Sequence, residues 1–204
     1  MLDAALRRLI DPPLDRAGRR LAAAGLSADA TTLAGFAVGL AALPLLAAGA
    51  YGWALAAILA NRLADGLDGA VARARGPSDL GGYLDIVCDF LFYAAVVFGF
   101  VLAAPANRLP GAFLLFAFMG TGSSFLAFAV FAARRGLESR ARGLKSLYYL
   151  GGLTEGTETI ALFVSACLFP AAFAWLAWLF GAACWATTLA RILEAWRRLG
   201  PARS

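Results

Sequence analysis

The sequence predicts an all-α integral membrane protein with six transmembrane helices, preceded by an N-terminal amphipathic helix on the membrane surface. Hydrophobic residues make up 61% of the 204 residues and charged residues 15%, and the mean hydropathy is +0.73. A soluble monomer would have to expose much of that apolar surface, which monomers rarely do. The apolar residues also gather in stretches long enough to cross a bilayer, at about 20 residues each.

The first element, residues 2–25, is basic and weakly amphipathic. We expect Pro12-Pro13 to break it. Beyond this break, apolar and arginine side chains lie on opposite faces, which is typical of a helix on an anionic membrane surface. No short apolar core precedes a small-residue cleavage site, so the segment does not resemble a cleaved signal peptide.

Six apolar stretches follow, with short breaks that are rich in glycine and proline. They lie near residues 31–50, 53–74, 80–103, 111–133, 147–169 and 171–193. We therefore divide the chain into a basic juxtamembrane helix (1–30), a six-helix transmembrane domain that holds the candidate site (31–193) and a basic cytoplasmic tail (194–204).

The basic residues predict that both termini are cytoplasmic. With the N-terminus inside, the outer segments hold Arg108 alone, whereas the inner segments hold many arginines and Lys145. Trp53, Trp175 and Trp178 then fall at the outer ends of their spans, where interfacial anchors belong. This asymmetry accounts for the net charge of +5 without a nucleic-acid partner.

The chain has no histidine, which limits its chemistry. Histidine-ligated zinc, Ser-His-Asp hydrolysis and haem with an axial histidine are all excluded. Cys88, Cys167 and Cys184 lie far apart in apolar stretches and are interpreted as small core residues. Any chemistry must therefore use carboxylates, arginines, hydroxyls or Lys145.

Acidic side chains occur inside the predicted spans, at a cost of about 2.5–3.5 kcal/mol for each mid-helix aspartate. Asp65 and Asp68 are spaced i,i+3 near the cytoplasmic end of the second span. Asp85 and Asp89 are spaced i,i+4 near the start of the third. Because the turn at 75–79 folds these two helix ends together, the four carboxylates should converge in the inner half of the membrane.

Four clustered aspartates need positive charge or protons. Arg62 and Arg73 are the basic residues within these two helices, too few for four ion pairs. Protonation of some aspartates would reduce the charge, but all-oxygen ligands favour Mg²⁺ or Mn²⁺, and two such ions form a clamp for phosphoryl chemistry. Gly69 and Gly81 would let a bulky ligand approach the backbone.

These residues form one continuous pattern, DxxDGxxAR from Asp65 to Arg73 followed by GxxxDxxxD from Gly81 to Asp89. The pattern resembles the signature of the CDP-alcohol phosphotransferase family, with every named position present. Residues 74–80 form a gap one residue shorter than is common in that family. Ala28-Asp29 stands where the family often has Pro-Asn. The resemblance extends over the whole six-span layout.

The resemblance implies transfer of a phosphatidyl group from a CDP-linked lipid, usually CDP-diacylglycerol, to an alcohol hydroxyl, with release of CMP. It implies that Asp65, Asp68 and Asp85 bind one Mg²⁺ or Mn²⁺ ion, that Asp65, Asp85 and Asp89 bind a second, and that Asp89 is the general base. It also implies a homodimer in a bacterial inner membrane, with the active site facing the cytoplasm. The implied CDP pocket is lined by Asp68, Gly69, Ala72, Arg73 and Gly81.

The acceptor alcohol stays open. Basic residues around Arg134 and Lys145 slightly favour a phosphorylated acceptor such as glycerol 3-phosphate or inositol phosphate, although a positive-inside loop explains them equally well. Glu155 and Glu158, in the cytoplasmic half of the fifth span, would suit a neutral polyol or an amino-alcohol, or could pair with a nearby cation such as Arg62. The stretch 151–159 resembles a little-characterised bacterial branch of the family.

A divalent-cation transporter or channel using the same aspartates is the alternative function. Transporters more often show inverted repeats and broken helices at the bilayer midplane. Here the acidic residues cluster at one end of their helices, and ion passage would not require Gly69, Ala72 and Arg73. The sequence therefore favours the enzyme.

Overall fold

The computed structural model describes residues 2–136 and 153–200, with side chains from residue 12 onward, and every regular element within them is a helix. The first half holds α1 (Leu2–Ala23), α2 (Ala28–Leu40), α3 (Ala42–Ala47), α4 (Tyr51–Arg75) and α5 (Asp79–Ala103). The second half holds η1 (Pro105–Asn107), α6 (Arg108–Arg134), α7 (Gly156–Leu168), η3 (Pro170–Ala172) and α8 (Phe173–Leu199).

Four segments of the described chain are long and apolar enough to cross a membrane: Ala28–Ala47, Asp79–Ala103, Pro105–Arg134 and Pro170–Leu199. These agree with four of the six predicted spans. The predicted span 53–74 is the 25-residue helix α4, which is long enough but carries the charges of the acidic motif. The predicted span 147–169 corresponds to α7, an apolar helix of 13 residues, and its residues 147–152 lie outside the described part. The fold is therefore an all-α membrane protein.

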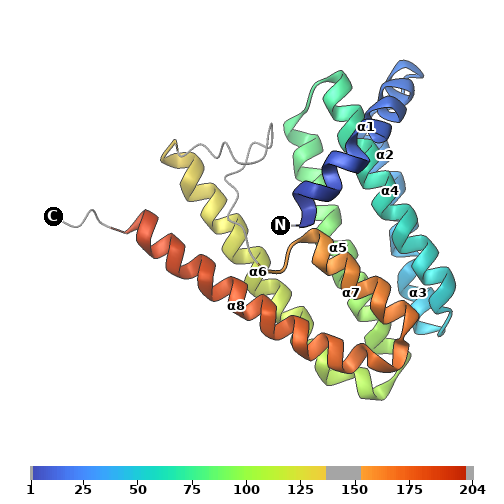
Figure 1. Cartoon of the computed structure of the whole chain (residues 1–204), viewed down its shortest axis with the longest axis vertical. Coiled ribbons are helices and arrows are strands. Elements are labelled where there is room, and N and C mark those ends of the chain that lie inside the picture. The colour runs from blue at the N-terminus through green and yellow to red at the C-terminus, as the bar shows by residue number, and fades with distance from the viewer. Residues whose placement is uncertain (1, 137–152, 201–204) are drawn as a thin grey trace.

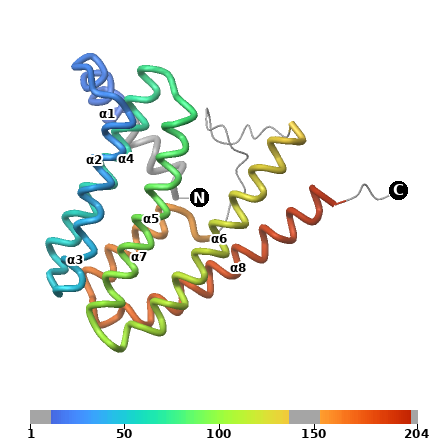
Figure 2. Tube along the Cα trace, turned by 180° about the vertical axis from the view of Figure 1, so that it is seen from behind, coloured from blue at the N-terminus to red at the C-terminus, as the bar shows by residue number. Residues whose placement is uncertain are grey.

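The helices form two groups that diverge toward one end of the molecule (Figures 1 and 2). One group contains α1, α2, α3, α4, α5 and α7, with α4 packed against α1, α2 and α7. The other is the pair α6 and α8, which lie side by side. The start of α2, the end of α4 and the start of α5 gather at one end of the first group, which places the acidic motif there.

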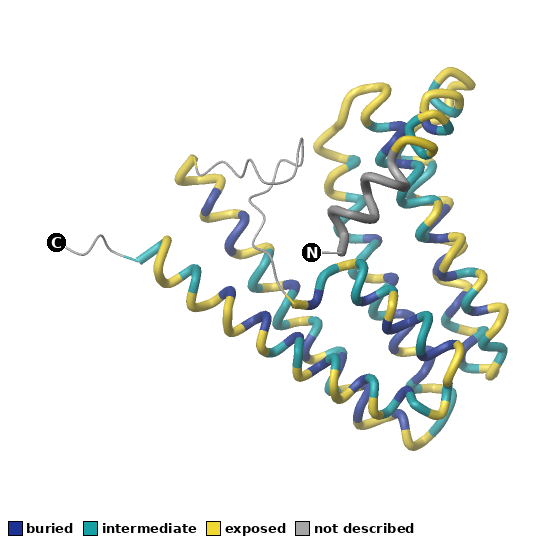
Figure 3. Tube along the Cα trace, in the orientation of Figure 1, coloured by how far each residue is buried: buried dark blue, intermediate teal, exposed yellow. Residues whose placement is uncertain are grey.

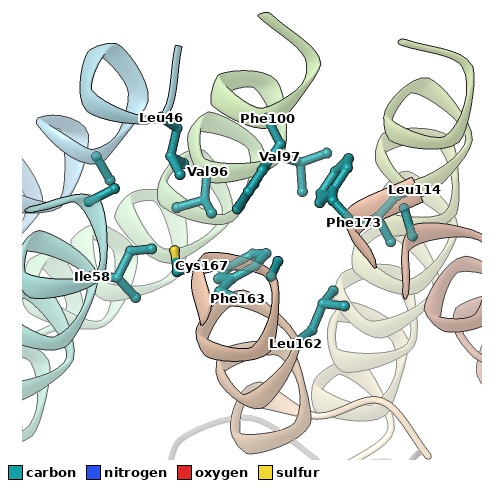
Figure 4. Packing of buried hydrophobic residues seen from close by; sticks show 14 of the residues in the cluster. Leu46, Ile58, Val96, Val97, Phe100, Leu114, Leu162, Phe163, Cys167 and Phe173 are labelled. Carbon is teal, nitrogen blue, oxygen red and sulfur yellow. The ribbon is translucent and has the colours of Figure 1, made fainter. Parts of the chain in front are cut away.

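The main buried cluster extends from where the two groups meet toward the acidic motif, because it includes Phe92 as well as Phe100 and Phe173. Phe100 of α5 stacks on Phe173 at the start of α8, with ring centroids 4.4 Å apart (Figure 4). Ile58, Phe163 and Leu46 bring α4, α7 and α3 into the same cluster. Exposed residues line the outer faces of the helices (Figure 3), and many of these are large and apolar, as lipid-facing surfaces require.

The predicted break in the N-terminal segment is wrong, because α1 continues through Pro12 and Pro13. Both prolines are exposed, and their missing N–H groups do not end the helix. Part of the face assigned to the membrane surface packs on protein instead. Gly18 lies so close to α4 that a Cβ atom there would be 2.5 Å from the Cβ of Ala70. The composition of a helix face does not distinguish lipid from an apolar neighbour.

Candidate active site

A tight turn between α4 and α5 brings the two aspartate pairs together. Gly76 ends α4 with φ +99°, a conformation that suits glycine. The Ser78 hydroxyl then caps α5 by accepting a hydrogen bond from the Gly81 amide at 3.0 Å. As predicted, the four aspartates converge on one pocket. Its lining residues are Thr32, Gly35, Phe36, Asn61, Arg62, Asp65, Asp68, Asp85, Cys88 and Asp89.

Three of the four carboxylates are arranged as metal ligands. Asp65, Asp68 and Asp85 each offer an oxygen, and these oxygens all lie within 4.8 Å of one another. Asp68 is buried, whereas Asp65 and Asp85 are half-buried. An all-carboxylate donor set fits a hard divalent cation such as Mg²⁺ or Mn²⁺.

Helix α2 supports this trio from one side. The Thr32 hydroxyl donates a hydrogen bond of 2.6 Å to Oδ2 of Asp68. One turn further along α2, the carbonyl of Gly35 accepts a bond of 2.9 Å from Nδ2 of Asn61 on α4. The two helices therefore approach closely beside the pocket, and Thr32 orients a buried carboxylate.

The fourth carboxylate, Asp89, has a different partner. Nη2 of Arg62 donates to Oδ1 of Asp89 at 2.8 Å, and Nη1 lies 3.7 Å from Oδ2 of Asp65. The Arg62 guanidinium also lies over the rings of Phe92 and Tyr93. One end of the acidic cluster thus faces a cation supplied by the protein.

The residues predicted to line a CDP pocket lie around the same helix ends. Gly69 and Ala72 are half-buried and Arg73 is exposed. Arg73 forms an ion pair with Asp15 of α1, with Nη2 and Oδ1 2.6 Å apart. A Cβ atom on Gly81 would lie 3.0 Å from Oδ1 of Asp29 and 3.0 Å from the Ser78 hydroxyl oxygen.

Comparison with known proteins decides the family. The family model of CDP-alcohol phosphatidyltransferases matches residues 25–193, which contain the whole pocket. The chain belongs to this family. It is therefore a membrane transferase of phospholipid synthesis.

Relatives of the chain match nearly its full length. The inner membrane protein YnjF of Escherichia coli is 58% identical over 200 residues, covering 98% of this chain and 97% of YnjF. Archaetidylinositol phosphate synthase of Pyrococcus horikoshii is 30% identical over 200 residues, covering 95% of this chain and 96% of the synthase.

Solved structures show the same fold. Phosphatidylinositol phosphate synthase of Mycobacterium tuberculosis with CDP-DAG bound has a TM-score of 0.69 and 26% identity, over 94% of this chain and 97% of that one. Its structure with manganese and citrate has a TM-score of 0.73 and 24% identity, over 94% and 92% of the two chains.

Of the residues predicted to bind the acceptor, those that the structure describes are not among the lining residues of the aspartate pocket. Arg134 is exposed at the end of α6, and Lys145 lies outside the described residues. Glu155 and Glu158 form a capping box at the start of α7, in which the Glu155 amide donates to Oε2 of Glu158 at 3.1 Å. This bond gives the glutamates a structural role, and their part in an acceptor pocket stays a prediction.

Thr32, Asn61 and Arg62 were not predicted as site residues from the sequence. Asn61 and Arg62 carried a usable signal, because polar side chains inside apolar spans are most often functional. The same signal applies to Arg191 of α8, which is buried and donates to the carbonyl of Thr121 at 2.9 Å. Thr32 gave no such signal in the sequence, because a helical threonine commonly bonds only to its own helix.

Proposed function

We propose that this protein transfers a phosphatidyl group from CDP-diacylglycerol to an alcohol hydroxyl at the cytoplasmic face of the bacterial inner membrane. The convergence of four aspartates in one pocket, at the positions of the family signature, is the observation that carries the proposal. The inner membrane location of YnjF supports the placement. The donor is supported by the M. tuberculosis synthase, which was solved with CDP-DAG bound.

We place a divalent ion, Mg²⁺ or Mn²⁺, at Asp65, Asp68 and Asp85, whose oxygens are grouped for it. When bound, such an ion offsets negative charge on the diphosphate and on departing CMP. Asp89 contributes to the same pocket and is our candidate general base. It takes the proton of the acceptor hydroxyl as the new oxygen–phosphorus bond forms, and the bond to the CMP oxygen breaks.

The donor's nucleotide would lie over the α4–α5 helix ends, against Asp68, Gly69, Ala72, Arg73 and Gly81. If Gly69 carried a Cβ atom, the nearest atom to it would be Nη1 of Arg73, at 3.4 Å, so the surface there is open to a ligand. The Arg73 guanidinium suits a diphosphate because its planar donors match phosphate oxygens. The lipid tails could stay in the bilayer, since the pocket lies near one end of apolar helices.

We propose a phosphorylated polyol as the acceptor. Two of the named relatives are synthases of inositol-phosphate lipids, and the chain is basic around Arg134 and Lys145. The capping box at Glu155 and Glu158 gives these acids a role that needs no cationic substrate. Inositol phosphate and glycerol 3-phosphate are therefore the first acceptors to test.

The proposal includes the topology predicted from the sequence. In it, α4 and α7 complete six spans, both termini are cytoplasmic, and the protein is a homodimer. The domain limits 1–30, 31–193 and 194–204 follow the same division. The transporter alternative gains no support from the fold or from the relatives.

The decisive experiment measures CMP release from CDP-diacylglycerol by the purified protein with Mn²⁺ or Mg²⁺. The acceptor panel comprises inositol phosphate, glycerol 3-phosphate, inositol, serine and phosphatidylglycerol, with EDTA as a control. Asp65→Asn and Asp89→Asn should each abolish acceptor-dependent release. Asp79→Asn is the matched control, because Asp79 is exposed at the start of α5 and does not line the pocket. Near-normal activity in either pocket variant would refute the assignment.

A further inference from the structure

The cation at the Asp89 end of the pocket is a fixed part of the site. Nε and Nη2 of Arg62 both donate to Oδ1 of Asn61, at 2.9 and 2.5 Å. Asn61 is buried and is itself held by the carbonyl of Gly35. The guanidinium carbon lies 4.7 Å from the ring centroid of Phe92 and 5.5 Å from that of Tyr93. Hydrogen bonds and cation–π contacts thus hold Arg62 where it meets Asp89.

The four carboxylates divide into two sets. Asp65, Asp68 and Asp85 form the group whose oxygens lie within 4.8 Å of one another. Asp89 contacts Arg62 at 2.8 Å, and Asp65 of the first set lies 3.7 Å from the same guanidinium. The Arg62 side chain is only 17% exposed, so solvent screens its charge weakly.

This arrangement bears on the number of ions that the site binds. An ion shared by Asp65, Asp85 and Asp89 would take Asp89, the closest carboxylate partner of Arg62, as a ligand and would lie beside a weakly screened positive charge. An ion held by Asp65, Asp68 and Asp85 would keep the Thr32 support of Asp68 and would not need Asp89. The two ion positions are therefore unequal in this protein.

We propose that Arg62 is a positioning residue that supplies the positive charge at the Asp89 end of the pocket and weakens binding of a second divalent ion there. The protein then binds one ion tightly, at Asp65, Asp68 and Asp85, and a second one weakly. Arg62 also holds the Asp89 carboxylate in place by its hydrogen bond. This inference rests on the metal site of the proposed function.

The test is a Mn²⁺ titration of the full-length protein in detergent, following free Mn²⁺ by electron paramagnetic resonance. Wild type should bind one ion at least about tenfold more tightly than a second, within the roughly 5- to 150-fold range usual for coupled sites. Arg62→Gln should tighten the second site by about tenfold. Arg62→Lys keeps the charge and should leave that site weak. Arg108→Gln, an exposed arginine at the start of α6, controls for the loss of one charge and should match wild type.

Thermal unfolding in EDTA gives a second readout. Arg62→Gln should lower the unfolding midpoint because Asp89 loses its partner. Saturating Mn²⁺ should then raise the midpoint of Arg62→Gln by more than it raises that of Arg108→Gln. Two equally tight sites in wild type would overturn the proposal even if Arg62→Gln fails to fold. So would an Arg62→Gln titration that superimposes on wild type.

The design separates this inference from the proposed function. If wild type binds one ion, Asp68→Asn abolishes that binding, and Arg62→Gln changes nothing, only the role of Arg62 fails. If wild type binds no Mn²⁺ at all, the metal site of the proposed function fails and the role of Arg62 fails with it.

Discussion

Replacing Thr32 by valine should weaken metal binding without disturbing the fold. Valine has nearly the same shape but no hydroxyl, so the 2.6 Å hydrogen bond to Oδ2 of Asp68 is lost. Hydrogen bonds to charged groups contribute about 1.5–3 kcal/mol. Asp68 is buried, so water replaces the lost donor poorly.

This energy corresponds to a large change in affinity. At about 1.4 kcal/mol for each factor of ten, loss of the bond should raise the Kd of the tight Mn²⁺ ion roughly 10- to 100-fold. Removal of a residue that orients a metal ligand typically has an effect of that size. The assay is the Mn²⁺ titration, repeated as the Mn²⁺ dependence of CMP release.

The neighbouring threonine supplies a matched control. Thr31 donates to the carbonyl of Ser27 at 3.0 Å, and Thr32 also lies 3.1 Å from the carbonyl of Ala28. Because a hydroxyl donates a single proton, Thr31→Val loses a bond within α2, whereas Thr32→Val loses the bond to Asp68. The reasoning would be refuted if both variants changed the Kd for Mn²⁺ equally. It would also be refuted if the Kd of Thr32→Val stayed within about twofold of the wild-type value.

Three further predictions test neighbouring features. Gly81→Ala should lower activity at least about tenfold because its Cβ would lie 3.0 Å from Asp29 and Ser78 oxygens, whereas Gly82→Ala, with no atom in reach, should not. Gly18→Ala should lower the free energy of unfolding by about 1–3 kcal/mol in chemical denaturation, because its Cβ would lie 2.7 Å from the backbone of α4; an unchanged value would contradict the packing of α1. Glu158→Gln keeps the capping box. Removing about 1 kcal/mol of repulsion between the Glu158 carboxylate and the acceptor phosphate should lower the KM for a phosphorylated acceptor about fivefold. An unchanged KM would show that Glu158 has only its structural role.

The sequence predicted the centre of the site because that geometry is local. Spacings of three and four residues put Asp65 with Asp68, and Asp85 with Asp89, on single helix faces. A short turn between consecutive helices then leaves little choice in how these faces meet. The convergence of all four aspartates therefore follows from residue spacing and helix geometry alone.

The partners of these aspartates could not be derived in this way. The contacts of Thr32 with Asp68 and of Gly35 with Asn61 depend on which face of α2 packs on α4. Apolar helices in a bilayer offer several faces of similar hydropathy, so periodicity does not select one. The packing of α1 on α4 could not be predicted for the same reason, because it depends on the close approach of Gly18.

The site also explains why α4 does not qualify as a membrane span by hydropathy, although it is 25 residues long. Its charges would each cost about 2.5–3.5 kcal/mol if left alone at the centre of a bilayer. They are not left alone: Arg62 pairs with Asp65 and Asp89, Thr32 bonds to Asp68, and Arg73 pairs with Asp15. These partners come from α1, α2, α4 and α5, so the packing of four helices supplies partners for the charged side chains of the acidic motif. A substitution that detaches α1 or α2 should therefore destabilise α4 and disorder the candidate site together.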